Sequence, residues 1–112
     1  MTDNLPIEID CQTVAARLRA NEDFVLVDCR ETDEHVIVKI ASARLLPMSQ
    51  IASRLGELEP LRNSQFAVHC HHGARSLKVA HWLRNQGYAK AQSMAGGIDA
   101  WAVEIDPSLP RY

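Results

Sequence analysis

Short strand-like runs alternate along this chain with segments whose apolar residues recur at helical spacing, and no other feature limits the fold as much. The runs at residues 24–27 and 66–68 are continuously apolar, which is typical of strands buried on both faces. Strands separated by helices pair in parallel, because the helix returns the chain to the same edge of the sheet. The sequence therefore predicts an α/β fold with a central, mostly parallel sheet of about five short strands and helices on both faces. The predicted strands are residues 5–9, 24–27, 43–46, 66–68 and 91–94.

The segments between these strands carry helix signals. Asp10 is placed to cap a first helix, and Gly87 to end the helix predicted over residues 76–86. After Pro47, the spacing of Ile51, Leu55 and Leu58 predicts another helix, with Pro60 as its stop. Shorter helical segments are predicted at residues 32–36 and 98–103.

Size and charge limit the class of protein. A chain of 112 residues, 46% of them hydrophobic, can bury a core without disulfides or a structural metal, so residues 1–112 are expected to form one domain. Twelve basic residues against 14 acidic ones leave a net charge of -2 and no extended basic face for nucleic acid or anionic membranes. No window approaches the roughly 20 apolar residues of a membrane span, and residues 1–4 are acidic, unlike the start of a signal peptide. We therefore expect a cytoplasmic protein that binds neither nucleic acid nor membranes.

The three cysteines are Cys11, Cys29 and Cys70, an odd number at wide spacing that argues against a disulfide framework and suits a reducing compartment. Cys11 opens an amphipathic helix and Cys29 follows a buried strand, so both are expected to be structural. Ligands in sheets of this kind bind beyond the carboxyl ends of the strands, where Asp28 and Cys70 both lie. Cys29 lies there too, which leaves a resolving or regulatory role open.

The loop that begins at Cys70 is suited to hold negative charge. It joins a predicted strand to a predicted helix, so the free N–H groups of the helix's first turn face the sulfur and stabilise a thiolate. Gly73 lets the loop close so that successive N–H groups point toward one centre. Arg75 adds a permanent cation whose planar fork suits an oxyanion. The loop therefore predicts a nucleophilic cysteine.

Three ordered segments resemble the rhodanese-like sulfurtransferase family. Residues 70–75, Cys-His-His-Gly-Ala-Arg, resemble its active-site loop, which places an arginine five positions after the cysteine. Residues 26–31, Leu-Val-Asp-Cys-Arg-Glu, are similar to its aspartate-and-arginine segment, and residues 87–88 with 95–101 resemble its C-terminal signature. Residues 38–43 lack glycines that many members carry, so the loop there is expected to differ. Together the segments cover nearly the whole chain.

The resemblance implies a ping-pong sulfur transfer in which the Cys70 thiolate takes a sulfane sulfur from a donor such as thiosulfate, and a nucleophilic acceptor then removes it from the Cys70 persulfide. It implies no cofactor and no metal. The partners would be a small-molecule sulfur donor and a thiophilic acceptor, or a protein in either role. The implied site consists of the catalytic residues Cys70 and Arg75, the substrate-binding loop residues His71, His72, Gly73, Ala74 and Ser76, and the supporting residues Asp28 and Arg30.

Several other interpretations stay open beside this one. Asp28 and Arg30 are explained more simply as a structural ion pair. A cysteine-dependent phosphatase or arsenate reductase also uses a thiolate in an arginine-ended loop, but the related phosphatases have one residue more than the four between Cys70 and Arg75. The shorter loop better suits one added sulfur atom. A persulfide carrier or protein-docking module with only incidental activity would carry the same loop, so the sequence separates it poorly from an enzyme.

Overall fold

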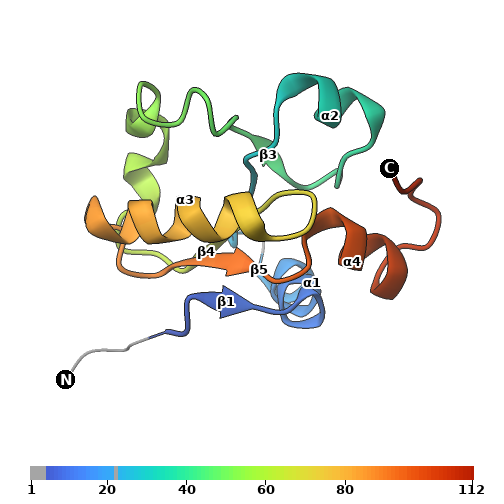
Figure 1. The fold of residues 1–112 in the computed structure, drawn as a ribbon. Helices are drawn as coiled ribbons and strands as arrows, with labels where there is room; N and C mark the ends of the chain where they lie inside the picture. The colour runs from blue at the N-terminus through green and yellow to red at the C-terminus, as the bar shows by residue number, and fades with distance from the viewer. Residues whose placement is uncertain (1–4, 22) are drawn as a thin grey trace.

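A computed structural model describes residues 5–21 and 23–112, and its centre is a five-stranded sheet in the order β1-β5-β4-β2-β3 (Figure 1). Every pairing in this sheet is parallel. The strands are β1 (Glu8–Ile9), β2 (Leu26–Asp28), β3 (Arg44–Leu45), β4 (Phe66–His69) and β5 (Ala91–Met94). Residues 1–4, whose acidic character is unlike the start of a signal peptide, lie outside the described residues, as does residue 22.

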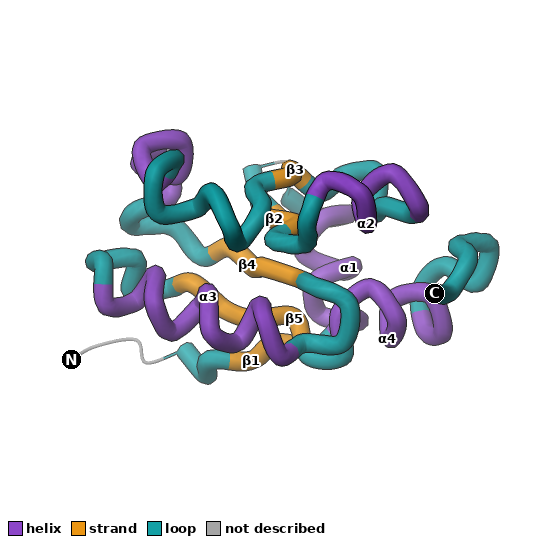
Figure 2. The backbone as a smooth tube through the Cα atoms, turned by 45° about the horizontal axis from the view of Figure 1, so that its top comes forward, coloured by secondary structure: helices purple, strands orange, loops and turns teal. Residues whose placement is uncertain are grey.

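Helices cover both faces of the sheet. On one face, α3 (Ala74–Asn85) and the 3-10 helix η1 (Leu55–Leu61) pack against inward residues such as Val27 and Val68. On the other face, α1 (Cys11–Ala20) and α4 (Gly97–Glu104) pack against Leu26 and Ala67. Figure 2 shows α3 running beside β4 and β5, while α2 (Thr32–Ile37) lies near the ends of β2 and β3. Within residues 5–21 and 23–112, no helix is both long and apolar enough to cross a membrane.

The predicted fold class is confirmed, and the reason is visible in the central strands. All residues of β2 and β4 are buried, because helices cover the sheet above and below, and both strands are apolar on both faces up to their last residues, Asp28 and His69. The predicted cap of the first helix is also present, since Asp10 Oδ1 accepts a hydrogen bond from the Thr13 N–H at 2.7 Å. The apolar runs and the cap residues therefore place the main elements correctly.

The helix predicted after Pro47 is wrong in type and in its end. Residues 48–54 form turns, and η1 is a 3-10 helix that contains Pro60 rather than ending before it. Gly56 disfavours a continuous α-helix and Pro60 cannot donate a backbone hydrogen bond, so the segment takes shorter 3-10 turns. Ile51 and Leu58 are nevertheless buried, as their spacing predicts.

Candidate active site

Cys70 follows β4 directly, and its sulfur lies inside the loop that leads into α3. Cys70 Sγ accepts hydrogen bonds from the Gly73 N–H at 3.1 Å and the Ser76 N–H at 3.3 Å. Gly73 has a φ of 111°, a conformation that favours glycine and turns the loop back toward the sulfur. Cys70 is 1% exposed, so the sulfur sits in a small buried cradle of N–H donors. Such a cradle stabilises negative charge on sulfur.

The first turn of α4 is hydrogen-bonded to the backbone of this loop. The Ile98 N–H donates to the Cys70 carbonyl at 2.9 Å, and the Asp99 N–H donates to the His71 carbonyl at 3.1 Å. These are free N–H groups of a first helical turn, and the loop carbonyls satisfy them. Gly97 makes the approach possible, because a Cβ there would lie 2.4 Å from the His71 oxygen and 2.5 Å from the Cys70 oxygen. The glycine pair in the C-terminal signature therefore lets α4 contact the loop backbone.

Arg75 is paired with a residue that sequence reasoning missed. Its Nη1 donates to Glu34 Oε1 at 2.6 Å and its Nη2 to Glu34 Oε2 at 2.9 Å. The hydrogen bonds from Arg75 lower the pKa of Glu34 to about 2, so the pair stays ionised at neutral pH. Glu34 belongs to α2 and lies 41 residues from Arg75 in the chain, so no local sequence pattern predicts this ion pair. The contact fixes the guanidinium at the rim of the loop.

Asp28 and Arg30 form a buried ion pair, and both side chains are 0% exposed. Arg30 Nε donates to Asp28 Oδ1 at 3.0 Å, and Arg30 Nη2 donates to Oδ2 at 2.8 Å and to the Val38 carbonyl at 2.6 Å. Burial alone would raise the pKa of Asp28, but the hydrogen bonds from Arg30 and the charge of His69 bring it down to about 2. The pair thus ties the end of β2 to the segment after α2, as the structural interpretation expects.

Aromatic rings line one side of the loop. His71 stacks between His72 and Tyr112, with ring centroids 3.8 Å apart on each side. The Tyr112 hydroxyl donates to Glu34 Oε2 at 2.8 Å and accepts from Arg30 Nη1 at 2.9 Å. Figure 1 shows the last segment rising from α4 toward α2. Through its ring on His71 and its hydroxyl group on Glu34, Tyr112 connects the loop to α2. Sequence reasoning missed this residue, because a lone aromatic near the end of a chain carries no motif.

One group of side chains in the described part of the chain has ligand atoms close enough for a metal ion. The side-chain ligand atoms of His71, His72 and Asp99 lie within 4.8 Å of one another. The two imidazoles are stacked and His72 Nε2 lies 3.8 Å from Asp99 Oδ2, while Asp99 also accepts two hydrogen bonds from Arg111. At this side of the loop, the stacked His71 and His72 rings therefore lie beside the Asp99–Arg111 ion pair.

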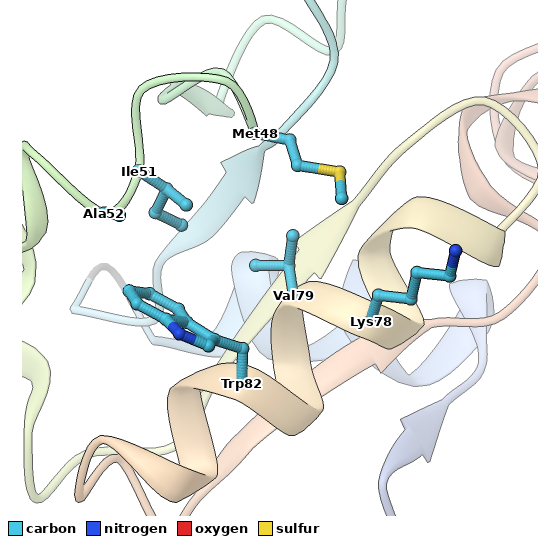
Figure 3. A pocket seen from close by; sticks show the side chains of 6 residues that line it. All are labelled: Met48, Ile51, Ala52, Lys78, Val79 and Trp82. Atoms are coloured by element: carbon cyan, nitrogen blue, oxygen red, sulfur yellow. The ribbon is translucent and has the colours of Figure 1, made fainter.

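An apolar groove with a volume of about 300 Å³ runs along α3 beyond the loop (Figure 3). Met48 and Ile51 approach it from the segment after β3, while Val79 and Trp82 approach it from α3. Lys78 lies at its edge and extends away from Trp82. The groove therefore offers an apolar surface about one helical turn from the end of the Cys70 loop.

Comparison with known proteins identifies the family. A family profile described as the rhodanese-like domain matches residues 11–104. The chain belongs to this family. The matched residues include the Cys70 loop, Glu34, the buried Asp28–Arg30 pair and the glycines at the start of α4, whereas Tyr112 lies beyond the matched segment.

Individual rhodanese-like proteins resemble this chain over most of its length. A sulfurtransferase of Allochromatium vinosum is 37% identical over 95 residues, which are 85% of this chain and 87% of that protein. A rhodanese-like/PpiC domain-containing chloroplastic protein of Arabidopsis thaliana is 33% identical over 93 residues, but this chain spans only 31% of its length. The crystal structure of a Staphylococcus aureus rhodanese-like domain protein superposes with a TM-score of 0.79 at 27% identity, covering 96% of this chain and 99% of that one. These matches confirm the family and the fold.

Proposed function

We propose that this protein is a sulfurtransferase in which Cys70 accepts a sulfane sulfur from a donor such as thiosulfate and passes it to a nucleophilic acceptor. The observation that carries the proposal is the cradle of N–H groups around Cys70 Sγ, from Gly73 and Ser76 at 3.1 and 3.3 Å. This chain matches 87% of the length of the Allochromatium relative named sulfurtransferase, which supports the same activity here.

The first half of the reaction forms a persulfide. The Cys70 thiolate attacks the sulfane sulfur of thiosulfate, a Cys70 sulfur–sulfur bond forms, and the sulfur–sulfur bond of the donor breaks with its electron pair leaving on sulfite. The N–H groups of the loop stabilise the negative charge on the terminal sulfur. We assign the departing sulfite to the Arg75 guanidinium, where the oxyanion would compete with the Glu34 carboxylate for Nη1 and Nη2. His71 and His72 border the same rim and shape the mouth of the site.

In the second half, a thiophilic acceptor attacks the terminal sulfur and restores the Cys70 thiolate. The chemistry needs only this cysteine and its surrounding donors. A small molecule and a protein both satisfy it as donor or acceptor, so the proposal includes both. Cys11, Cys29 and Cys70 are free thiols, which accords with the cytoplasmic location proposed from the sequence.

The test is the mass of the intact protein before and after thiosulfate, and again after cyanide. The parent and a Cys11→Ser control should transfer sulfur to cyanide, whereas Cys70→Ser should not, because a hydroxyl cannot form the persulfide. Hydrolysis of an aryl phosphate is measured in parallel. Cys70-dependent phosphate hydrolysis without any sulfur adduct would replace the proposal with a phosphatase. An adduct at Cys70 that cyanide removes only slowly would indicate a carrier or docking module with incidental activity rather than an enzyme.

A further inference from the structure

A second cysteine lies beside Cys70 at the end of the neighbouring strand. Asp28 of β2 is in register with His69 of β4, and the Cys29 N–H donates to the His69 carbonyl at 3.0 Å. This hydrogen bond continues the parallel ladder beyond the last paired residues of the two strands. Cys29 and Cys70, the next residues in each chain segment, are therefore lateral neighbours at the carboxyl edge of the sheet.

Both thiols also lie on the same face of the sheet. Side chains alternate along a strand, and Cys29 and Cys70 share one core cluster with Val27 and Val68, whereas Leu26 packs on the opposite face. Neighbouring strands are about 4.8 Å apart, and the Cα atoms of a disulfide are about 4.4 to 6.8 Å apart. The spacing of a parallel ladder therefore falls within the Cα separation that a disulfide between these two residues needs.

We propose that Cys29 is a second catalytic residue that resolves the Cys70 persulfide when no acceptor arrives, releasing sulfide and leaving a Cys29–Cys70 disulfide. The inference rests on the proposed function, since the persulfide is its substrate. Cys29 sulfur attacks Cys70 Sγ, a sulfur–sulfur bond forms between them, and the bond from Sγ to the terminal sulfur breaks with its electron pair. The Cys29 proton leaves with the sulfide. Two thiol sulfurs are oxidised and the sulfane sulfur is reduced, so the donor itself supplies the oxidising equivalents.

The environment of Cys29 makes this step slow, which separates it from ordinary turnover. The side chain is 0% exposed, and burial raises the pKa of its thiol far above the usual range, with the charges of Cys70 and Asp28 acting in the same direction. A protonated thiol is a weak nucleophile, but its neighbour is held in place, so no encounter is required. When an acceptor is present, it therefore removes the sulfur before Cys29 reacts. Cys29 attacks the Cys70 persulfide only when no acceptor is available.

Cys11 provides a matched control because it is also a buried free cysteine but lies on the opposite face of the sheet. Its thiol points toward the carbonyls of Ala95 at 3.7 Å and Gly97 at 3.9 Å. Burial raises the pKa of Cys11 to about 12, so it shares the protonated state of Cys29 without its position beside Cys70. A general effect of buried thiols would appear in both variants.

The experiment treats the full chain with thiosulfate in the absence of acceptor, removes the donor, and follows both released sulfide and intact mass over time. We expect the parent and Cys11→Ser to release one equivalent of sulfide and to finish lighter by two hydrogen atoms, with a Cys29–Cys70 crosslinked peptide after digestion. Cys29→Ser should keep one added sulfur atom and release no sulfide. Cys29→Ala is prepared alongside, and near-parent thermal denaturation identifies whichever variant is properly folded.

The outcomes separate the two proposals. If the parent keeps the added sulfur as long as the Cys29 variants do, the persulfide is real and the resolving role is refuted. If the Cys29 variants release sulfide at the parent rate, another group performs the step and the role is again refuted. If neither the parent nor any variant gains a sulfur atom or releases sulfide, the proposed function fails and the resolving role fails with it.

Discussion

Replacing Gly97 by alanine tests whether the contact between α4 and the Cys70 loop stabilises the fold. A Cβ at this position would lie 2.4 Å from the His71 oxygen, 2.5 Å from the Cys70 oxygen and 2.6 Å from the His71 carbonyl carbon, all of them backbone atoms. No side-chain rotation relieves such contacts. Either the loop or the start of α4 must move, and the hydrogen bonds from the Ile98 and Asp99 N–H groups would lengthen or break.

The magnitude follows from three contributions. A non-glycine residue at a φ of 60° costs about 1 kcal/mol. Forcing an extra methyl group into a packed region costs about 1 to 3 kcal/mol, and each lost backbone hydrogen bond about 1 kcal/mol. One displacement relieves the clash and breaks the bonds, so the last two contributions overlap. We expect Gly97→Ala to lower the free energy of unfolding by about 3 kcal/mol.

The assay is urea denaturation followed by circular dichroism, with Gly56→Ala as the matched control. Gly56 lies in η1 with no atom within 4 Å of an added Cβ and no positive φ, so its replacement should leave the free energy of unfolding unchanged or raise it by up to about 1 kcal/mol, the opposite sign to Gly97→Ala. Sulfur transfer by Gly97→Ala should fall as well, because the carbonyls that move belong to Cys70 and His71. An unfolding free energy for Gly97→Ala within about 0.5 kcal/mol of the parent would refute the argument.

Three further predictions concern the charged and aromatic groups of the site. Arg75→Lys should lower the catalytic efficiency for thiosulfate at least about tenfold, because an ammonium group cannot form the two parallel bonds to Glu34; a change within about twofold would contradict this. Tyr112→Phe keeps the ring on His71 but loses both hydroxyl hydrogen bonds, so thermal denaturation should show a loss of about 1 kcal/mol, with Tyr112→Ala losing more. Burial lowers the pKa of His69 to about 4 from 6.5, so the unfolded state binds this proton first and stability should fall as pH drops from about 6.5 through about 4; equal urea midpoints at pH 7 and pH 5 would contradict this.

The parts of this structure that the sequence predicts are those governed by local pattern. Continuous apolar runs predict β2 and β4, Asp10 predicts the start of α1, and Gly73 predicts the tight turn of the Cys70 loop. Each depends on residues close together in the chain. The α-helix predicted around Pro60 was wrong because the apolar spacing there fits both an α-helix and 3-10 turns. Backbone hydrogen bonding decides between the two.

The parts that the sequence could not predict depend on contacts between distant residues. Glu34 reaches Arg75 only because α2 and the Cys70 loop meet at the same edge of the sheet. Tyr112 reaches the site because the chain turns back after α4. The pairing of Cys29 with Cys70 follows from strand register, which the local pattern of either strand leaves undetermined.

The pairing of β1 with β5 determines when the molecule can finish folding during synthesis. Glu8 and Ile9 are among the first described residues to leave the ribosome, yet their strand partners are Ser93 and Met94, near the other end of the chain. Synthesis proceeds from the N-terminus, and contacts of large sequence separation form late because a long loop must close. The edge strand β1 therefore stays unpaired until β5 has been synthesised. A ribosome stalled before β5 would hold a nascent chain with an incomplete sheet and with a Cys70 loop that lacks its contact with α4. At that stage the exposed edges of the strands would be accessible to a chaperone.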